Sequence, residues 1–159
     1  MESITESLIT AREGLKRLEH MIYVTLKYTR TVDVIVNTLK RLTDIYELIF
    51  DALFLHLMEK GVFATEPKSP ALKANRVAEH YHDDPELIKF YTFYKFLKII
   101  LNSEHGKREE FRRHVTLVVN LEDSTAEVNI DNLENCEKFA KMFLTHSVDL
   151  VAKNNGKII

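Results

Sequence analysis

The sequence predicts a mainly α-helical fold: an antiparallel bundle of four long helices and one short helix, with a β-hairpin inserted before the last helix. Two observations carry this prediction. Apolar residues recur at alternating steps of four and three over the long stretches, as in helices that pack against one another. After residue 113 the apolar period changes to two, which is typical of β-strands. The length of 159 residues suits one domain, which we place at 1–152, followed by a frayed tail at 153–159.

The first helix is expected over residues 3–29 and the second over 31–60. An unbroken helix through both would be about 85 Å long, which exceeds the diameter of a compact domain of this size. We therefore expect a sharp turn between Tyr28 and Val32, with Thr31 as the N-cap of the second helix. The two helices then form an antiparallel hairpin with facing seams.

The stretch from Thr31 to Gly61 is the predicted centre of the core. Beyond Tyr46 its apolar residues occupy nearly every face, as in a helix that other helices surround. This apolar excess is more than four helices need to cover. We therefore expect a homodimer, formed through this helix or through the edge of the sheet. His56 lies on the seam and is expected to be buried with a hydrogen bond, or to lie at an oligomer contact.

Two Pro-containing motifs mark the next helices. Ser69-Pro70 predicts a short helix over 70–80, and Asp84-Pro85 predicts a long helix over 85–103 that stops near Gly106. The predicted hairpin spans about 115–130. Asp131 is then the expected cap of the last helix, with Glu134 completing a capping box. Much of the core is predicted to come from large side chains of these helices: Phe50, Phe54, Phe90, Tyr94, Leu97, Phe139 and Phe143.

Composition excludes several classes of protein. The net charge of −2 argues against a surface that is wholly a nucleic-acid or membrane footprint. Charged residues interrupt every apolar run well before the roughly 20 residues of a membrane helix, so we expect no membrane association. Cys136 is the only cysteine, which fits a reducing compartment, and the first residues do not resemble a signal peptide. We therefore expect a cytoplasmic protein.

His80 and His82 are candidate metal ligands. They lie between Glu79 and Asp84, and imidazoles among carboxylates in a short span are donors that zinc accepts. The same composition is also typical of a solvated connector at the end of a helix, and that alternative stays open.

The stretch from Lys107 to His114 is the candidate nucleic-acid contact, through Lys107, Arg112 and Arg113. Between Glu86 and His114 there are seven Lys or Arg residues against four Glu, with aromatic residues interleaved. Basic residues beside aromatic rings bind RNA phosphates and stack on bases. The alternative is that these aromatic residues, which lie at helical spacing, fill the core.

Arg108 and His114 are separated by five residues, and this Arg-x5-His pattern in a small helical bundle resembles the HEPN family. The resemblance implies a metal-independent endoribonuclease that acts as a dimer. His114 would then transfer the proton at the ribose 2′-hydroxyl or the leaving oxygen, and Arg108 would stabilise charge on the scissile phosphate. The order of helices and hairpin also resembles that of archaeal-type helical proteins with no assigned function.

The sequence contains no Gly-rich phosphate loop, nucleophile elbow or paired-cysteine ligand set, so we predict no cofactor. Packing explains every long segment. We therefore expect a non-enzymatic interaction or scaffold module that forms a homo-oligomer and binds a protein partner. The alternative is a HEPN-like endoribonuclease or RNA-binding protein, for which RNA is the partner.

Overall fold

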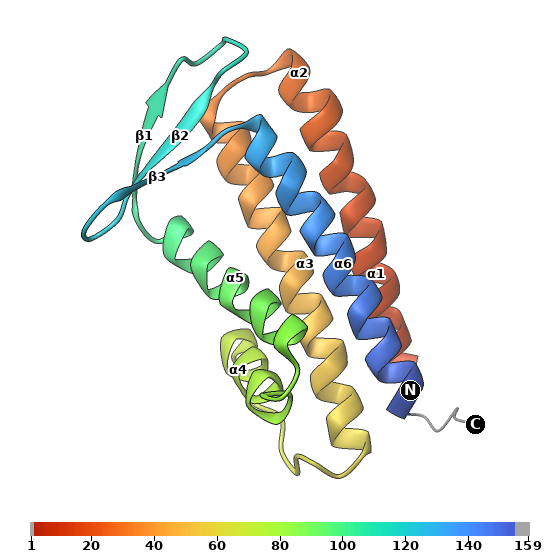
Figure 1. Cartoon of the computed structure of the whole chain (residues 1–159). Coiled ribbons are helices and arrows are strands. Elements are labelled where there is room, and N and C mark those ends of the chain that lie inside the picture. The colour runs from red at the N-terminus through yellow and green to blue at the C-terminus, as the bar shows by residue number, and fades with distance from the viewer. Residues whose placement is uncertain (1, 155–159) are drawn as a thin grey trace.

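The computed structural model describes residues 2–154 and confirms a mainly α-helical fold with a small sheet before the last helix. Helix α1 (Glu2–His20), the π-helical segment η1 (Met21–Thr25) and α2 (Leu26–Tyr28) form one continuous rod, antiparallel to α3 (Val32–Glu59) (Figure 1). The predicted helical hairpin is therefore confirmed. Its turn ends at the predicted cap, because Thr31 Oγ1 accepts a hydrogen bond from the backbone N–H of Val34 at 3.3 Å.

The two Pro-containing motifs begin helices as predicted. Ser69 caps α4 (Pro70–His80), and Asp84 caps α5 (Pro85–Leu101) by accepting the backbone N–H of Leu87 at 3.1 Å. The predicted cap of α6 (Ile130–Asn154) is wrong. Asn129 and Asn132 cap this helix instead, each donating its backbone N–H to the other's side-chain oxygen at 2.9 Å.

The sheet has three antiparallel strands in the order β1 (Glu104–Arg108), β2 (Thr116–Asn120), β3 (Thr125–Val128). Strands β2 and β3 are the predicted hairpin. Strand β1 corrects the prediction that a helix runs to residue 103 and stops near Gly106, because Gly106 lies inside β1, opposite Val118. Its residues Glu-His-Gly-Lys-Arg are polar and lack apolar alternation, so only pairing with β2 defines them as a strand.

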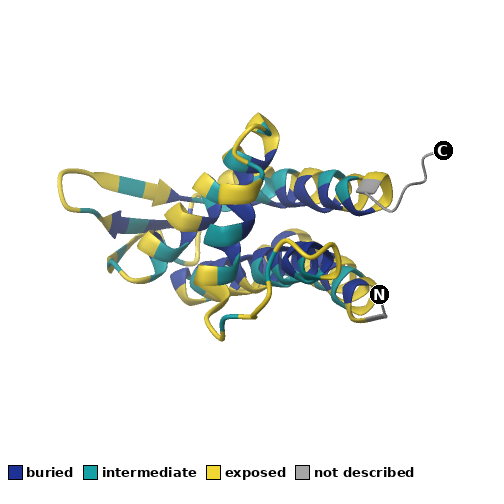
Figure 2. Ribbon diagram, turned by 90° about the horizontal axis from the view of Figure 1, so that it is seen from below, coloured by how far each residue is buried: buried dark blue, intermediate teal, exposed yellow. Residues whose placement is uncertain are grey.

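The core is built on α3, as predicted. Phe143 on α6 packs between Phe50 and Phe90, with ring centroids 4.9 Å from each. Every predicted core residue is buried except Phe139, which is half-buried. Figure 2 shows the buried residues on the helix surfaces that face one another. Among the described residues, α3 exposes no large apolar side chain, so the apolar excess that led us to expect a homodimer is covered within one chain.

None of the helices in residues 2–154 is both long and apolar enough to cross a bilayer. The tail predicted to begin at residue 153 is corrected in part, because Lys153 and Asn154 belong to α6. The rest of that prediction lies outside the described residues.

Candidate functional site

The loop between β1 and β2, residues 109–115, is attached to the turn between α2 and α3. The backbone N–H of Phe111 donates to the carbonyl of Arg30 at 2.6 Å. The carboxylate of Glu110 accepts the backbone N–H of Val32 at 2.8 Å. These two bonds bring the basic stretch found in the sequence against a segment almost eighty residues earlier in the chain.

This loop holds two residues in a strained backbone conformation. Glu109 has φ 57° and Phe111 has φ 68°, the left-handed region that non-glycine residues rarely adopt. Each such residue costs on the order of 1–2 kcal/mol. The attachment to Arg30 and Val32 fixes this geometry, and the Phe111 ring is directed outward with 76% of the residue exposed.

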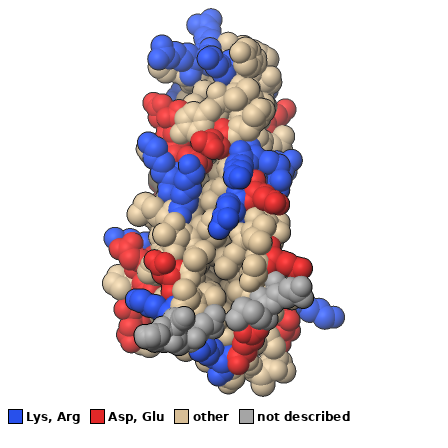
Figure 3. Space-filling model, turned by 90° about the vertical axis from the view of Figure 1, so that its right-hand side faces the viewer, with Lys and Arg blue, Asp and Glu red and all other residues tan. Residues whose placement is uncertain are grey.

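Basic and aromatic side chains gather where this loop meets the end of the rod. Tyr28, the last residue of α2, is 80% exposed. Figure 3 shows Lys and Arg gathered at the end of the molecule where α2 lies in Figure 1. We call this surface the basic–aromatic end, and it comprises Lys27, Tyr28, Arg30, Phe111, Arg112 and Arg113. Within residues 2–154, none of its four cations has an ion-pair partner.

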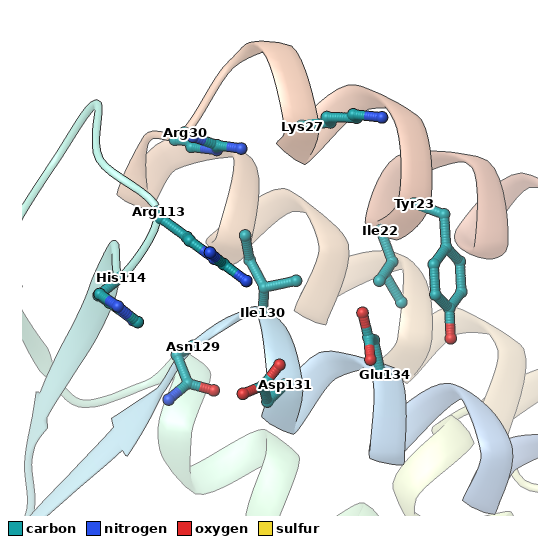
Figure 4. Close-up of a pocket in the computed structure, with 10 residues that line it drawn as sticks. All are labelled: Ile22, Tyr23, Lys27, Arg30, Arg113, His114, Asn129, Ile130, Asp131 and Glu134. Atoms are coloured by element: carbon teal, nitrogen blue, oxygen red, sulfur yellow. The ribbon is translucent and has the colours of Figure 1, made fainter.

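A cavity of about 310 Å³ adjoins the basic–aromatic end. It lies between the rod, the β1–β2 loop and the first turn of α6 (Figure 4). Cationic side chains come from the rod, the turn that follows it and the β1–β2 loop, and the carboxylates of Asp131 and Glu134 come from α6 on the opposite side. The full lining is Ile22, Tyr23, Lys27, Arg30, Arg113, His114, Asn129, Ile130, Asp131 and Glu134.

The charged residues that line this cavity form no ion pair in the described part of the chain. Among the described residues, no ion pair joins its cations to Asp131 or Glu134, and the buried Nε of Arg30 has no hydrogen-bond partner. Tyr23 shares the space with these carboxylates. Its partial burial, followed by the carboxylates of Glu134, Glu137 and Glu19, raises the pKa of the Tyr23 phenol above its usual value. The cavity therefore presents donors on one wall and acceptors on the other.

The two residues of the HEPN-like pattern have different surroundings. His114 is exposed and lines the cavity. Arg108 lies on β1, where its guanidinium forms an ion pair with Glu127 of β3 at 2.8 Å, and it is not among the described residues that line the cavity. The hydrogen bond from Arg108 lowers the pKa of the Glu127 carboxyl. Lys107, the remaining basic candidate, lies 3.6 Å from Glu110.

The two candidate metal ligands, His80 and His82, are at the end of α4. The His80 ring packs edge-on against Tyr81, with centroids 4.8 Å apart. His82 contacts the carbonyl of Glu79 at 3.1 Å and the carboxylate of Asp83 at 3.1 Å. Across residues 2–154, no three His, Cys, Asp or Glu side chains converge as metal ligands would.

Cys136 is half-buried on α6 beside the core. Burial raises the pKa of its thiol to about 11, so the side chain carries its proton at neutral pH. The reactive form of cysteine is the thiolate. Cys136 therefore acts as a small packing residue.

Sequence reasoning found the loop residues of the site but missed those of the rod, of the turn that follows it and of α6: Tyr23, Lys27, Tyr28, Arg30, Asp131 and Glu134. One signal was available, because Tyr23 and Tyr28 lie off the apolar seam that Ile22 and Leu26 continue. Aromatic residues that lie off a seam and beside several basic residues are candidates for an interaction surface.

Comparison of the chain with protein-family models, curated proteins and solved structures finds no significant match in any of the three.

Proposed function

We propose that this protein is a non-enzymatic binding module that holds single-stranded RNA at its basic–aromatic end. One observation carries the proposal: the Tyr28 and Phe111 residues are 80% and 76% exposed beside four cations that have no ion-pair partner among the described residues. Two large aromatic residues exposed beside a group of cations form a surface that can contact both a ring and a phosphate.

Single-stranded RNA supplies what this surface lacks. Its unstacked bases offer flat faces to exposed aromatic rings, and its phosphates offer charge to Lys and Arg. The attached loop supports the proposal as well, because a strained backbone that keeps an aromatic ring in water is typical of binding sites. The net charge of −2 argues against a surface that binds RNA over its whole area and agrees with a local site.

The phosphate contacts are tested by salt dependence. A short fluorescent uridine-rich RNA is titrated with the protein by anisotropy at several salt concentrations. Each phosphate contact adds about 0.7 to the slope of log affinity against log salt for a single strand. Replacing Arg112 and Arg113 together by Ala should therefore weaken binding and reduce the slope by about 1.4. The matched control replaces Arg12 and Arg17, two exposed arginines of α1, by Ala. Equal slopes in the two double variants contradict the proposal.

The stacking contacts are tested by removing the aromatic face and keeping the apolar bulk. Phe111→Leu and Tyr28→Leu should each weaken binding, since base stacking on an aromatic ring contributes about 1–3 kcal/mol per base. Phe96→Leu is the control, because Phe96 is an exposed aromatic residue on α5, outside the basic–aromatic end. If Phe111→Leu and Tyr28→Leu both bind the RNA as tightly as the wild type, the proposal is contradicted.

The HEPN-like alternative predicts cleavage rather than binding alone. Intact RNA after prolonged incubation agrees with a non-enzymatic module. Cleavage that His114→Ala abolishes would contradict the proposal and favour the nuclease. The homo-oligomer expected from the sequence also stays a prediction, and light scattering tests it against the monomer mass of 18.6 kDa.

A further inference from the structure

We infer that the cavity beside the basic–aromatic end binds a guanine base of the RNA. The inference rests on the proposed function and adds a sequence preference to it. The starting observation is that the cavity carries charges of both signs that form no ion pair among the described residues, with Arg30 and Arg113 opposite Asp131 and Glu134 (Figure 4). A bound group that satisfies both walls must offer hydrogen-bond acceptors on one side and donors on the other.

The remaining lining favours a flat, partly apolar group. Ile22, Ile130 and the ring of Tyr23 line the same cavity as the charged residues. Its volume of about 310 Å³ lies at the lower end of the range for small-ligand sites. An aromatic base between apolar side chains, with its edges toward polar groups, matches this distribution.

Guanine matches the carboxylate wall better than the other bases. Its Watson–Crick edge presents two adjacent donors, N1–H and the N2 amino group, and a carboxylate accepts two parallel hydrogen bonds. Adenine, cytosine and uracil each offer one donor on that edge. The guanine acceptors O6 and N7 match an arginine, which is the commonest specific partner of these two atoms. Arg30 and Arg113 both line this wall.

The test compares short uridine-rich RNAs that differ at one central position: guanosine, inosine, adenosine, cytidine or uridine. Inosine is the sharpest comparison because it keeps N1–H, O6 and N7 and lacks only the N2 amino group. The wild-type protein should bind the guanosine RNA about 5- to 150-fold more tightly than the uridine RNA, the range of one bidentate base contact. Inosine should lose most of this preference.

Asp131→Asn combined with Glu134→Gln removes both carboxylates and should abolish the preference while leaving affinity for the uridine RNA equal or slightly higher. Glu122→Gln, an exposed residue between β2 and β3, is the control and should keep the preference. Equal binding of all five RNAs by the wild type, or a preference that survives in the double variant, overturns the guanine pocket and leaves the proposed function standing.

Two further outcomes separate the inference from the proposed function. Failure of every RNA to bind contradicts the proposed function. In that case the cavity is tested by calorimetric titration of the protein with GMP and with AMP. The Asp131→Asn/Glu134→Gln variant is the control. Binding of GMP alone identifies a free guanine nucleotide as the source of the base. Absence of both GMP binding and a guanosine preference overturns the inference as well.

Discussion

The carboxylate of Glu110 accepts a hydrogen bond from the backbone N–H of Val32, 2.8 Å away, and so joins the β1–β2 loop to the first turn of α3. A negative charge at this position also interacts favourably with the helix dipole. Lys107 lies 3.6 Å from the same carboxylate. One side chain therefore stabilises the central helix and fixes the loop that carries Phe111 and the two arginines.

Glu110→Ala should lower the free energy of unfolding by about 1.5–3 kcal/mol, the usual contribution of a hydrogen bond to a charged group. Glu110→Gln should lower it less, because its amide oxygen still accepts the Val32 N–H. Urea denaturation measures both. In native protein, limited trypsin digestion should cut faster after Arg112 and Arg113 in the Ala variant. A Gln variant as unstable as the Ala variant would show that charge alone matters.

Phe111→Gly should give a more stable protein than Phe111→Ala, by about 1 kcal/mol. Both variants remove the ring, but only glycine adopts a φ of 68° without steric cost. The difference in stability between the two variants is smaller than the cost of the left-handed backbone, because glycine also has more conformational freedom in the unfolded chain. Thermal unfolding of the two variants side by side measures the difference. The reverse order of stability would contradict a strained loop.

Two buried tyrosines should respond in opposite directions to loss of their hydroxyl groups. The Tyr46 hydroxyl has no hydrogen-bond partner in residues 2–154, and burial raises its pKa. Tyr46→Phe should therefore raise the free energy of unfolding by about 1 kcal/mol. The Tyr94 hydroxyl donates to Glu47 at 2.7 Å, so Tyr94→Phe should lower it by about 1.5 kcal/mol. Equal effects of the two changes in chemical denaturation would contradict this assignment.

The free energy of unfolding should decrease as the pH is lowered below about 6.5, because of His56. Its side chain is fully buried, and within the described part of the chain neither ring nitrogen has a hydrogen-bond partner. Burial, together with the charge of Lys60, lowers its pKa from the usual 6.5. The unfolded chain therefore binds a proton below that pH before the folded chain does, and the loss continues until pH reaches the folded pKa. Urea unfolding at several pH values gives the free energy of unfolding as a function of pH. Between pH 6.5 and the folded pKa, this free energy should depend less on pH in His56→Leu than in the wild type. An unchanged pH dependence would contradict this assignment.

The helices could be predicted from the sequence because their signals are local. Ser69, Asp84 and Thr31 stand directly before the helices that they cap, and the apolar seams need no knowledge of distant residues. His56 was predicted to be buried with a hydrogen bond, or to lie at an oligomer contact. It is buried, but the predicted hydrogen bond is wrong within the described residues, because a seam does not reveal whether a partner lies nearby. The cap of α6 was misassigned because Asp131 and Glu134 match the common capping-box pattern better than the Asn129 and Asn132 that form it.

The candidate site could be predicted only in part. Arg112, Arg113 and His114 are visible as a basic run in the sequence. Their neighbours on α2 and α6 are not, because two long-range contacts from the loop, to Arg30 and Val32, create the neighbourhood. The left-handed backbone of Phe111 has no sequence signal either, since phenylalanine is among the residues least suited to it.

The polar strand β1 affects how readily the sheet can pair with the sheet of another molecule. Segment Thr116–Asn120 is the most apolar strand of the sheet, and an apolar strand with an unpaired edge can pair with another chain. It lies in the middle of the sheet, with β1 and β3 hydrogen-bonded along its two sides. On the β1 side, another chain therefore meets an edge that carries Glu104, Lys107 and Arg108, and such charges disfavour pairing with a further strand. Pairing with β2 itself would require β1 or β3 to detach first.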